Sequence, residues 1–329
     1  MRSIKVISTA KYLPKRIISA EQMDKELGVA SGWVEKKTGV LKRHFVDDET
    51  CVSMGAIVVK EALKKANLKF EDLDLLLGAS GTPAQAIPCT SALIQEALGQ
   101  EKSGVPCFDM NSTCLSFITA IDTISYAVHA GKYKRVAIVS SEVASVGINP
   151  KQKESAALFG DGAACVIIER DEYGESGILS SSMNTYSSGA HDAEIKAGGT
   201  LRHPVAHQDV SGEDFMFNMN GPKIFRQASK LVRPFFDELI KKANITKDEM
   251  KLFIPHQASM LSLAIAQKKM EISDEKFYRY VSDHGNQIAA SLPTGLHNAI
   301  ESKKIKRGDI VVMMGTSAGF SVGAIVLRY

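Results

Sequence analysis

Short apolar runs alternate with longer amphipathic runs along most of this 329-residue chain. The apolar, strand-like runs lie at residues 4–10, 73–80, 105–110, 135–142 and 163–170. The helix-like runs between them lie at residues 54–67, 89–100 and 114–132. The strand-like runs are almost continuously apolar, as is typical of strands that helices bury on both faces. The alternation therefore predicts an α/β fold with buried sheets.

The second half of the chain resembles the first. Residues 70–80 and residues 247–259 each combine a polar helix end, a strand-like run and a small-residue turn into a helix. A fold of two similar halves accounts for such a repeat, and we predict the halves to be residues 1–172 and 173–329. The segment from Ser181 to Met219 is rich in Ser, Gly, His and Asp and has little periodicity. We predict a long loop there, near the active site or a dimer interface.

Charge and cysteine content exclude several classes of function. Lys plus Arg total 40 and Asp plus Glu total 37, so the net charge of +3 is too small and too dispersed to favour nucleic acid or membrane binding. No run approaches the roughly 18 apolar residues of a membrane span. The five cysteines are odd in number and show no C-x-x-C spacing. We predict reduced thiols, with neither a disulfide framework nor a metal site, in a cytoplasmic protein.

Cys114 is the residue most indicative of chemistry. It follows Asn111-Ser112-Thr113, which breaks a strand-like run, and it begins the helix-like run at 114–132. A thiol at a helix N-terminus faces unpaired backbone N–H groups and the positive end of the helix dipole, which favours the thiolate. This position predicts a nucleophile. The alternative is a buried small hydrophobic residue, which is the commoner role of a cysteine.

Three further motifs contain polar or small residues that follow strand-like runs. They are IPHQAS with His256, DHGNQIAASLP with Asn286, and GTSAGFSVGA at 315–324. Reactive side chains gather at the C-terminal ends of strands in α/β folds. Taken alone, His256 also fits a core histidine and Asn286 a turn residue. The chain lacks G-x-x-x-x-G-K-[ST], and GDGAAC does not satisfy G-x-G-x-x-G, so nucleotide hydrolysis and dinucleotide redox chemistry are poorly supported.

Taken together, these motifs resemble those of one family. The order Cys114, His256, Asn286, combined with PHQA, HGN-x-x-A-A-S-x-P and FGDGA, closely resembles the β-ketoacyl-acyl carrier protein synthase III family of thiolase-fold condensing enzymes. The resemblance extends from the region of Trp33 to the final strand. It implies a thiolase-like five-layer αβαβα fold of two duplicated halves, and a homodimer.

The resemblance also implies a reaction. Cys114 takes an acyl group from an acyl-CoA, malonyl-acyl carrier protein loses CO2, and the resulting enolate attacks the acyl-cysteine to give β-ketoacyl-acyl carrier protein. His256 and Asn286 stabilise the enolate oxygen, and the backbone N–H groups of Cys114 and Ala318 form an oxyanion hole. Phe320 makes the surroundings of the malonyl carboxylate apolar. Such a reaction serves fatty acid or related acyl-chain biosynthesis.

The resemblance assigns four positions to substrate binding. Trp33 matches a tryptophan that stacks on the adenine of coenzyme A, and Lys37 and Lys153 stand where arginines are frequent. Lysine keeps the charge but loses the planar, bidentate geometry of arginine. Ile87 matches a residue that gates acyl-chain length and is commonly phenylalanine, so we expect a longer, branched or polar acyl group. Trp33 equally fits a core anchor.

Basic residues match the positions at which the family docks its carrier protein. They are Arg226, Lys268 and Lys269, and an acidic carrier suits them. The alternative is an ordinary solvated helix surface. At Leu261, where an arginine is frequent in the family, the chain departs from the pattern. Coenzyme A and the carrier's phosphopantetheine arm are substrates here, and no resident cofactor is expected.

The chain lacks the catalytic residues that two related classes of enzyme require. Thiolases use a second cysteine near the C-terminus, but no cysteine follows Cys165, and hydroxymethylglutaryl-CoA synthases use a glutamate that residues 78–88 do not contain. An acyltransferase that moves an acyl group from Cys114 to an alcohol or amine remains the main alternative, and a non-catalytic acyl-binding subunit is another. The presence of Asn286 favours condensation, because acyl transfer alone forms no enolate.

Overall fold

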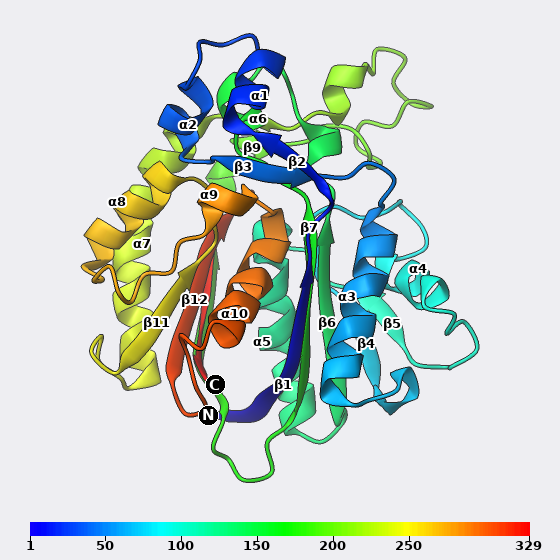
Figure 1. The fold of residues 1–329 in the computed structure, drawn as a ribbon, viewed down its shortest axis with the longest axis vertical. Coiled ribbons are helices and arrows are strands. Elements are labelled where there is room, and N and C mark those ends of the chain that lie inside the picture. The colour runs from blue at the N-terminus through cyan, green and yellow to red at the C-terminus, as the bar shows by residue number, and fades with distance from the viewer.

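A sheet of nine strands runs through the computed structural model, which describes residues 1–329 (Figure 1). Its strands are β1 (Arg2–Tyr12), β4 (Leu75–Gly78), β5 (Cys107–Asp109), β6 (Arg135–Glu142), β7 (Gly162–Arg170), β8 (Gly177–Thr185), β11 (Met250–Pro255), β12 (Ile310–Ser317) and β13 (Ser321–Arg328). Their order is β11-β12-β13-β8-β1-β7-β6-β4-β5. Two small sheets pair β2 (Arg16–Ser19) with β3 (Lys42–Phe45) and β9 (Ala193–Glu194) with β10 (Asn218–Met219).

Helices cover both halves of this sheet and also separate them. They are α1 (Ala20–Glu26), α2 (Trp33–Thr38), α3 (Cys51–Ala66), α4 (Thr90–Ala97), α5 (Ser116–His129), α6 (Lys153–Ala156), α7 (Gly221–Ala243), α8 (Met260–Met270), α9 (Val281–His284) and α10 (Ser291–Glu301). Strand β1 pairs with β7 along most of its length but with β8 only through Arg2 and Ser3. The nine strands therefore form two sheets that are joined at one end of β1.

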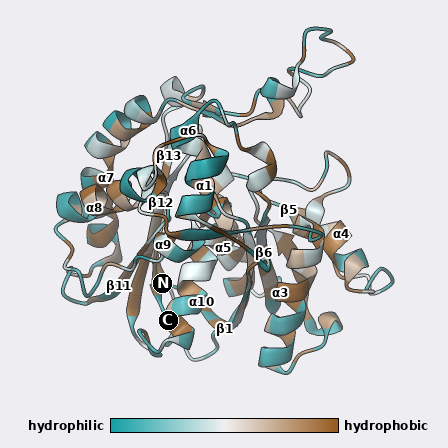
Figure 2. Ribbon diagram, turned by 45° about the horizontal axis from the view of Figure 1, so that its top comes forward, coloured by the Kyte–Doolittle hydropathy of each residue, from teal (hydrophilic) through white to brown (hydrophobic).

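The layers follow from the helix contacts. Helices α5 and α10 contact strands of both sheets and lie between them, α3 and α4 cover the outer face of β5-β4-β6-β7-β1, and α7 with α8 covers the other sheet (Figure 1). Hydrophobic side chains fill these layers: β11 is largely hydrophobic, whereas α1 at the surface is largely hydrophilic (Figure 2). This is the five-layer αβαβα arrangement that the family resemblance implies, and it is confirmed.

The two halves have the same strand order. In the first, β5-β4-β6-β7-β1 follow one another, and in the second Phe277 forms an isolated parallel bridge to Phe253 of β11, beside β12, β13 and β8. Phe277 thus occupies the place that β5 has in the first half. We propose the division between residues 172 and 173, in the turn from β7 to β8.

Two sequence-based boundaries differ from the structure. Strand β8 continues to Thr185, so the first residues of the segment predicted as a loop are in fact strand, paired with β13. The α-helix predicted from Cys114 begins at Ser116 instead, because Thr113–Leu115 form a tighter 3-10 turn.

Candidate active site

Cys114 lies in the 3-10 turn immediately before α5. This turn packs against β12 and against a second 3-10 turn at Ile288–Ala290, which belongs to the other half of the chain. Ser116 Oγ donates a hydrogen bond to Thr113 O at 2.7 Å and fixes the turn from the helix side. The Ser116 hydroxyl therefore helps to hold the backbone of this turn in place.

The Cys114 thiol is protonated in the resting protein. Burial, to which the nearby Glu142 carboxylate adds, raises the pKa of the Cys114 thiol to about 12. The sequence-based expectation of a favoured thiolate is therefore wrong, because the loss of water around the sulfur outweighs the helix N-terminus. The thiol must pass its proton to a neighbouring base before it can attack a substrate.

His256 directly follows β11 and is 6% exposed. Burial lowers the pKa of His256 to about 4, so its imidazole is neutral at pH 7. Its Nδ1 lies 2.7 Å from Ser291 Oγ. A Cβ added at Gly315 of β12 would lie 2.7 Å from His256 Cβ and 3.3 Å from Leu115 Cδ2. Glycine at 315 therefore allows His256 to approach the turn that carries Cys114.

Asn286 follows the short helix α9, so the prediction that it follows a strand is wrong. A single parallel bridge to Phe159 holds its backbone: Asn286 N–H donates to Leu158 O at 2.8 Å, and Gly160 N–H donates to Asn286 O at 3.1 Å. Its Oδ1 accepts the Ile288 N–H at 2.9 Å. The amide is thereby oriented, and its Nδ2 remains available to donate hydrogen bonds.

Glu142 ends β6 and is completely buried beside the site. Its carboxylate accepts the N–H groups of Gly81 at 2.6 Å and Thr82 at 3.0 Å, together with the Thr82 hydroxyl. Burial raises the pKa of Glu142 to about 7, although these hydrogen bonds and one from the Ala289 N–H each lower it. Glu142 thus links the loop after β4 to the turn that follows Asn286.

Two β-branched residues beside the site have left-handed backbones. Thr113 precedes Cys114 and has φ of +52°, and Ile288 has φ of +49°. Both border Gly81, where an added Cβ would lie 2.8 Å from Ile288 Cγ2 and 3.3 Å from Thr113 C. Left-handed geometry is unfavourable for β-branched residues and gathers at functional sites. The strain here borders both Cys114 and Asn286.

The hairpin of β12 and β13 carries the two remaining predicted residues. Ala318 lies in its turn, at the end of the strand that packs against the Cys114 turn. Phe320 is 2% exposed, and its backbone exchanges hydrogen bonds with Tyr186. Its Cβ also lies close to Gly189. The oxyanion role of Ala318 and the carboxylate-facing role of Phe320 stay predictions.

Trp33, Lys37 and Lys153 gather at the surface on α2 and α6, which pack against each other. Trp33 is half-buried, and Lys37 Nζ lies 6.0 Å from the centre of its ring. Lys37 Nζ is 3.6 Å from Glu154 Oε1, and Lys153 Nζ donates to Gly28 O at 3.3 Å. An aromatic ring and two ammonium groups therefore face one region, and each ammonium group already has a partner.

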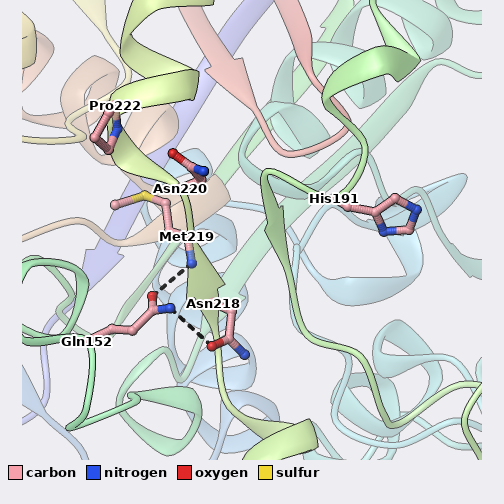
Figure 3. Close-up of a pocket in the computed structure, with 6 residues that line it drawn as sticks. All are labelled: Gln152, His191, Asn218, Met219, Asn220 and Pro222. Atoms are coloured by element: carbon pink, nitrogen blue, oxygen red, sulfur yellow. Dashed lines mark hydrogen bonds between the residues drawn. The ribbon is translucent and has the colours of Figure 1, made fainter.

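A polar cavity of about 350 Å³ lies next to α6 (Figure 3). It is lined by Gln152, His191, Asn218, Met219, Asn220 and Pro222. Gln152 Nε2 donates to Asn218 Oδ1 at 3.1 Å, and Met219 N–H donates to Gln152 Oε1 at 2.8 Å. Amide side chains line the cavity, and one of them, Gln152, directly precedes Lys153 in the sequence.

The other predicted positions are exposed. Arg226 lies on α7, and Lys268 and Lys269 lie on the adjacent α8, all with exposed side chains. Leu261 at the start of α8 is 61% exposed. Ile87 is 84% exposed, so within a single chain it does not line a closed pocket.

Helices α2 and α8 meet at a glycine. Gly39 ends α2 with φ of +72°, and a Cβ added there would lie only 2.3 Å from Met260 Cβ, at the first residue of α8. The helix that carries Trp33 and the helix that carries Lys268 are therefore in direct contact.

Comparison with known proteins identifies the family. Residues 240–329 match the family model described as 3-Oxoacyl-[acyl-carrier-protein (ACP)] synthase III C terminal, and residues 108–187 match the model of 3-Oxoacyl-[acyl-carrier-protein (ACP)] synthase III. The beta-ketoacyl-[acyl-carrier-protein] synthase III of Aquifex aeolicus is 33% identical over 325 residues, which cover 99% of each chain. The chain belongs to the 3-oxoacyl-[acyl-carrier-protein] synthase III family.

Solved structures agree with this membership. The Aquifex aeolicus synthase III structure has 32% sequence identity and a TM-score of 0.89, and the match covers 99% of this chain and 100% of that one. The priming beta-ketosynthase of the R1128 polyketide pathway has a TM-score of 0.90 at 23% identity, so it shares the fold. This confirms both the resemblance that the motifs suggested and the thiolase-like fold.

Three buried residues of this synthase III family member were not singled out from the sequence. Ser291 and Gln257 were visible within HGN-x-x-A-A-S-x-P and PHQA, and Glu142 as an acid that ends a strand-like run. Gln257 Oε1 accepts the N–H groups of Tyr280 and Val281, so it connects the turn after β11 to α9.

No group of three or more His, Cys, Asp or Glu residues is placed to hold a metal ion. No helix has both the length and the apolar character that crossing a membrane requires.

In this synthase III family member, the raised pKa of Cys114 predicts how the reactivity of its thiol depends on pH. Because the pKa of Cys114 is raised to about 12, its thiolate fraction increases throughout the range from about pH 7 to 10. Alkylation of Cys114 by iodoacetamide, followed by peptide mass mapping, should accelerate about tenfold per pH unit across that range. Free glutathione, as a reference thiol, should level off above about pH 8.5. A plateau for Cys114 below that pH would contradict the protonated resting state.

Proposed function

We propose that this protein catalyses the decarboxylative condensation of an acyl-CoA with malonyl-acyl carrier protein, giving β-ketoacyl-acyl carrier protein, CO2 and CoA. The observation that carries the proposal is the approach of the Cys114 turn to a buried neutral imidazole, His256, and to the Ile288–Ala290 turn, whose Ile288 N–H orients the Asn286 amide. Relatives that match along the whole chain bear the name of this activity.

Acylation begins with the protonated Cys114 thiol. His256 is neutral and so can accept that proton, which produces the thiolate that attacks the acyl thioester. The tetrahedral intermediate carries an oxyanion, for which the backbone N–H groups of Cys114 and Ala318 are the proposed donors. CoA leaves as the thiol when the proton returns from His256.

Condensation needs a different set of donors. Loss of CO2 from the malonyl thioester places negative charge on its carbonyl oxygen, and Asn286 Nδ2 can donate to it because Oδ1 is already engaged by Ile288. His256 supplies the second donor. Phe320 keeps water from the malonyl carboxylate, which destabilises that charge and favours its loss.

The surface around α2 and α6 suits the nucleotide of acyl-CoA. The Trp33 ring offers a face for the adenine, and Lys37 and Lys153 offer charges for the phosphates. The amide-lined cavity beside Gln152 has a suitable size for part of the phosphopantetheine arm. Arg226, Lys268 and Lys269 form the proposed carrier-docking face on α7 and α8.

A homodimer accounts for the position of Ile87. Strand β5 is an edge strand, and the nearby Phe108 is 36% exposed and Ile87 84% exposed. Unpaired edges and apolar surfaces of this kind are typically covered. A second copy placed there would bring Ile87 against the partner's acyl pocket. We also place the protein in the cytoplasm, because its five cysteines are free.

Substitution of Ile87 should change acyl preference. Ile87→Ala is expected to raise the ratio of kcat/KM for a branched or longer acyl-CoA over acetyl-CoA by about tenfold, and Ile87→Phe to lower it, because a gate acts by steric exclusion. Leu201→Ala changes a similarly exposed apolar residue, 85% accessible, and should leave the ratio unchanged. Identical preferences in all variants would remove Ile87 from the acyl pocket.

The test of the function is intact-mass analysis of malonyl-acyl carrier protein after incubation with the protein and a panel of acyl-CoA thioesters. Loss of CO2 together with gain of one acyl group is the expected result, and it identifies the acyl group. Acylated Cys114 with an unchanged carrier would instead favour transfer to an alcohol or amine. Absence of both changes with every thioester would contradict the proposal.

A further inference from the structure

A chain of hydrogen bonds connects the two candidate enolate donors. Asn286 Oδ1 accepts the Ile288 N–H at 2.9 Å, and Ser291 Oγ donates to Ile288 O at 3.0 Å. The same Ser291 Oγ lies 2.7 Å from His256 Nδ1. Ser291 is completely buried at the first residue of α10, whereas Asn286 and His256 are nearly so. One residue, Ile288, therefore orients Asn286 directly and His256 through a hydroxyl.

The proton of that hydroxyl determines where His256 carries its own. A serine hydroxyl has one proton, and the Ile288 carbonyl oxygen, which can only accept, lies 3.0 Å from Ser291 Oγ. When the hydroxyl donates to that carbonyl, its oxygen can only accept towards His256, and the 2.7 Å contact then requires a proton on Nδ1. A neutral imidazole with its proton on Nδ1 has a lone pair on Nε2. In that arrangement Nε2 is a proton acceptor and not a donor.

We propose that Ser291 is a positioning residue that holds the His256 proton on Nδ1 and so prepares Nε2 to take the proton of Cys114. This deepens, and rests on, the proposed acylation of Cys114. In that step the proton moves from Sγ to Nε2, and the thiolate forms a bond to the acyl carbon. The C–S bond to CoA then breaks, and the proton passes from Nε2 to the departing CoA sulfur.

The same hydroxyl permits the opposite arrangement in condensation. The Ile288 carbonyl also accepts the Ser291 backbone N–H, so it keeps a donor when the hydroxyl turns away. Ser291 Oγ–H then donates to Nδ1, and exchange with water moves the imidazole proton to Nε2. His256 can donate to the enolate oxygen from there. Acylation thus depends on Ser291 as an acceptor, whereas condensation needs only Nε2–H.

The first test is the tautomer of His256 in the free protein, read from long-range ¹H–¹⁵N correlation spectra at pH 7. The His256→Gln spectrum assigns the signal. Because burial lowers the pKa of His256 to about 4, the ring is neutral at that pH. We expect the proton on Nδ1 in the unsubstituted protein and a shift of population towards Nε2 in Ser291→Ala. A proton on Nε2 in the unsubstituted protein would overturn the proposal without any appeal to activity.

The second test separates the half-reactions. Acylation of Ser291→Ala, followed by intact mass in single turnover, should slow roughly 10- to 100-fold, the scale of a lost proton acceptor. Once the variant is acylated, its rate of malonyl-carrier decarboxylation should fall less than about threefold. This step needs His256 with its proton on Nε2, which is the tautomer that Ser291→Ala favours. Equal losses in both steps would indicate a merely structural role and overturn the proposal.

A matched serine controls for loss of a buried hydroxyl. Ser125 is completely buried in α5 and donates to the carbonyl three residues earlier, Asp122 O, at 2.6 Å, as Ser291 does to Ile288 O. Ser125→Ala should leave the His256 tautomer and the acylation rate unchanged, and Ser291→Thr, which keeps a hydroxyl, should retain the Nδ1–H signal. If no acyl-CoA acylates the unsubstituted protein, the proposed function is contradicted. The tautomer of His256 is measured in the free protein, so that result tests the role of Ser291 independently.

Discussion

Replacement of Cys114 by alanine is expected to abolish acyl-enzyme formation and to lower condensation by at least about a thousandfold. No other thiol can substitute for it. The remaining cysteines, Cys51, Cys89, Cys107 and Cys165, lie in other elements, and burial raises the pKa of Cys165, for example, as it does that of Cys114. Only Cys114 lies in the turn between β12 and the Ile288–Ala290 segment.

The measurement is intact mass after mixing with acyl-CoA, with thermal unfolding as a check on folding. Cys165→Ala is the matched control, since it removes a fully buried thiol from β7, and it should acylate at the unsubstituted rate. A covalent acyl adduct on Cys114→Ala would show that another residue is the nucleophile, and the proposed mechanism would then be wrong.

Replacement of Asn286 by alanine is expected to leave acylation within about threefold and to lower condensation roughly 10²- to 10³-fold, as for the loss of one oxyanion donor. The separation of the two effects follows from the chemistry, because only condensation forms an enolate. Single-turnover acylation and CO2 release from malonyl-carrier measure the two steps. Unchanged ketoacyl formation would contradict the assigned role.

Alanine also removes the acceptor for Ile288 N–H, so a second variant is needed. Asn286→Asp keeps an oxygen at that place but has no N–H to donate, and its charge opposes an enolate. It should therefore impair condensation at least as strongly as alanine. If aspartate restored condensation, Asn286 would act by holding the turn and not by donating to the substrate.

Much of the fold could be predicted from the sequence, because buried strands between helices have a distinct pattern. Strand β6 coincides with the run at 135–142, and β7 begins one residue before the run at 163–170. The connection of the two sheets could not be predicted. It depends on pairing of β1 with β8 through Arg2 and Ser3 alone, and two residues leave no periodic signal.

The residues of the candidate site could be predicted from the sequence, but their burial, charge state and supporting contacts could not. The motifs located Cys114, His256 and Asn286, yet the charge state of the thiol depends on burial and on Glu142, which is distant in sequence. Asn286 follows a helix, and its backbone is held by a single bridge to Phe159, in the other half of the chain. Such contacts arise only when the two halves are packed together.

Gly39 restricts how this family member can diverge. Any side chain there would collide with Met260, so the close contact of α2 and α8 requires glycine at this position. Exposed residues, such as Lys37 on one helix and Leu261 on the other, can be exchanged without disturbing that contact. The departures from the family pattern at these two positions are of that kind, and they leave the scaffold between them unchanged.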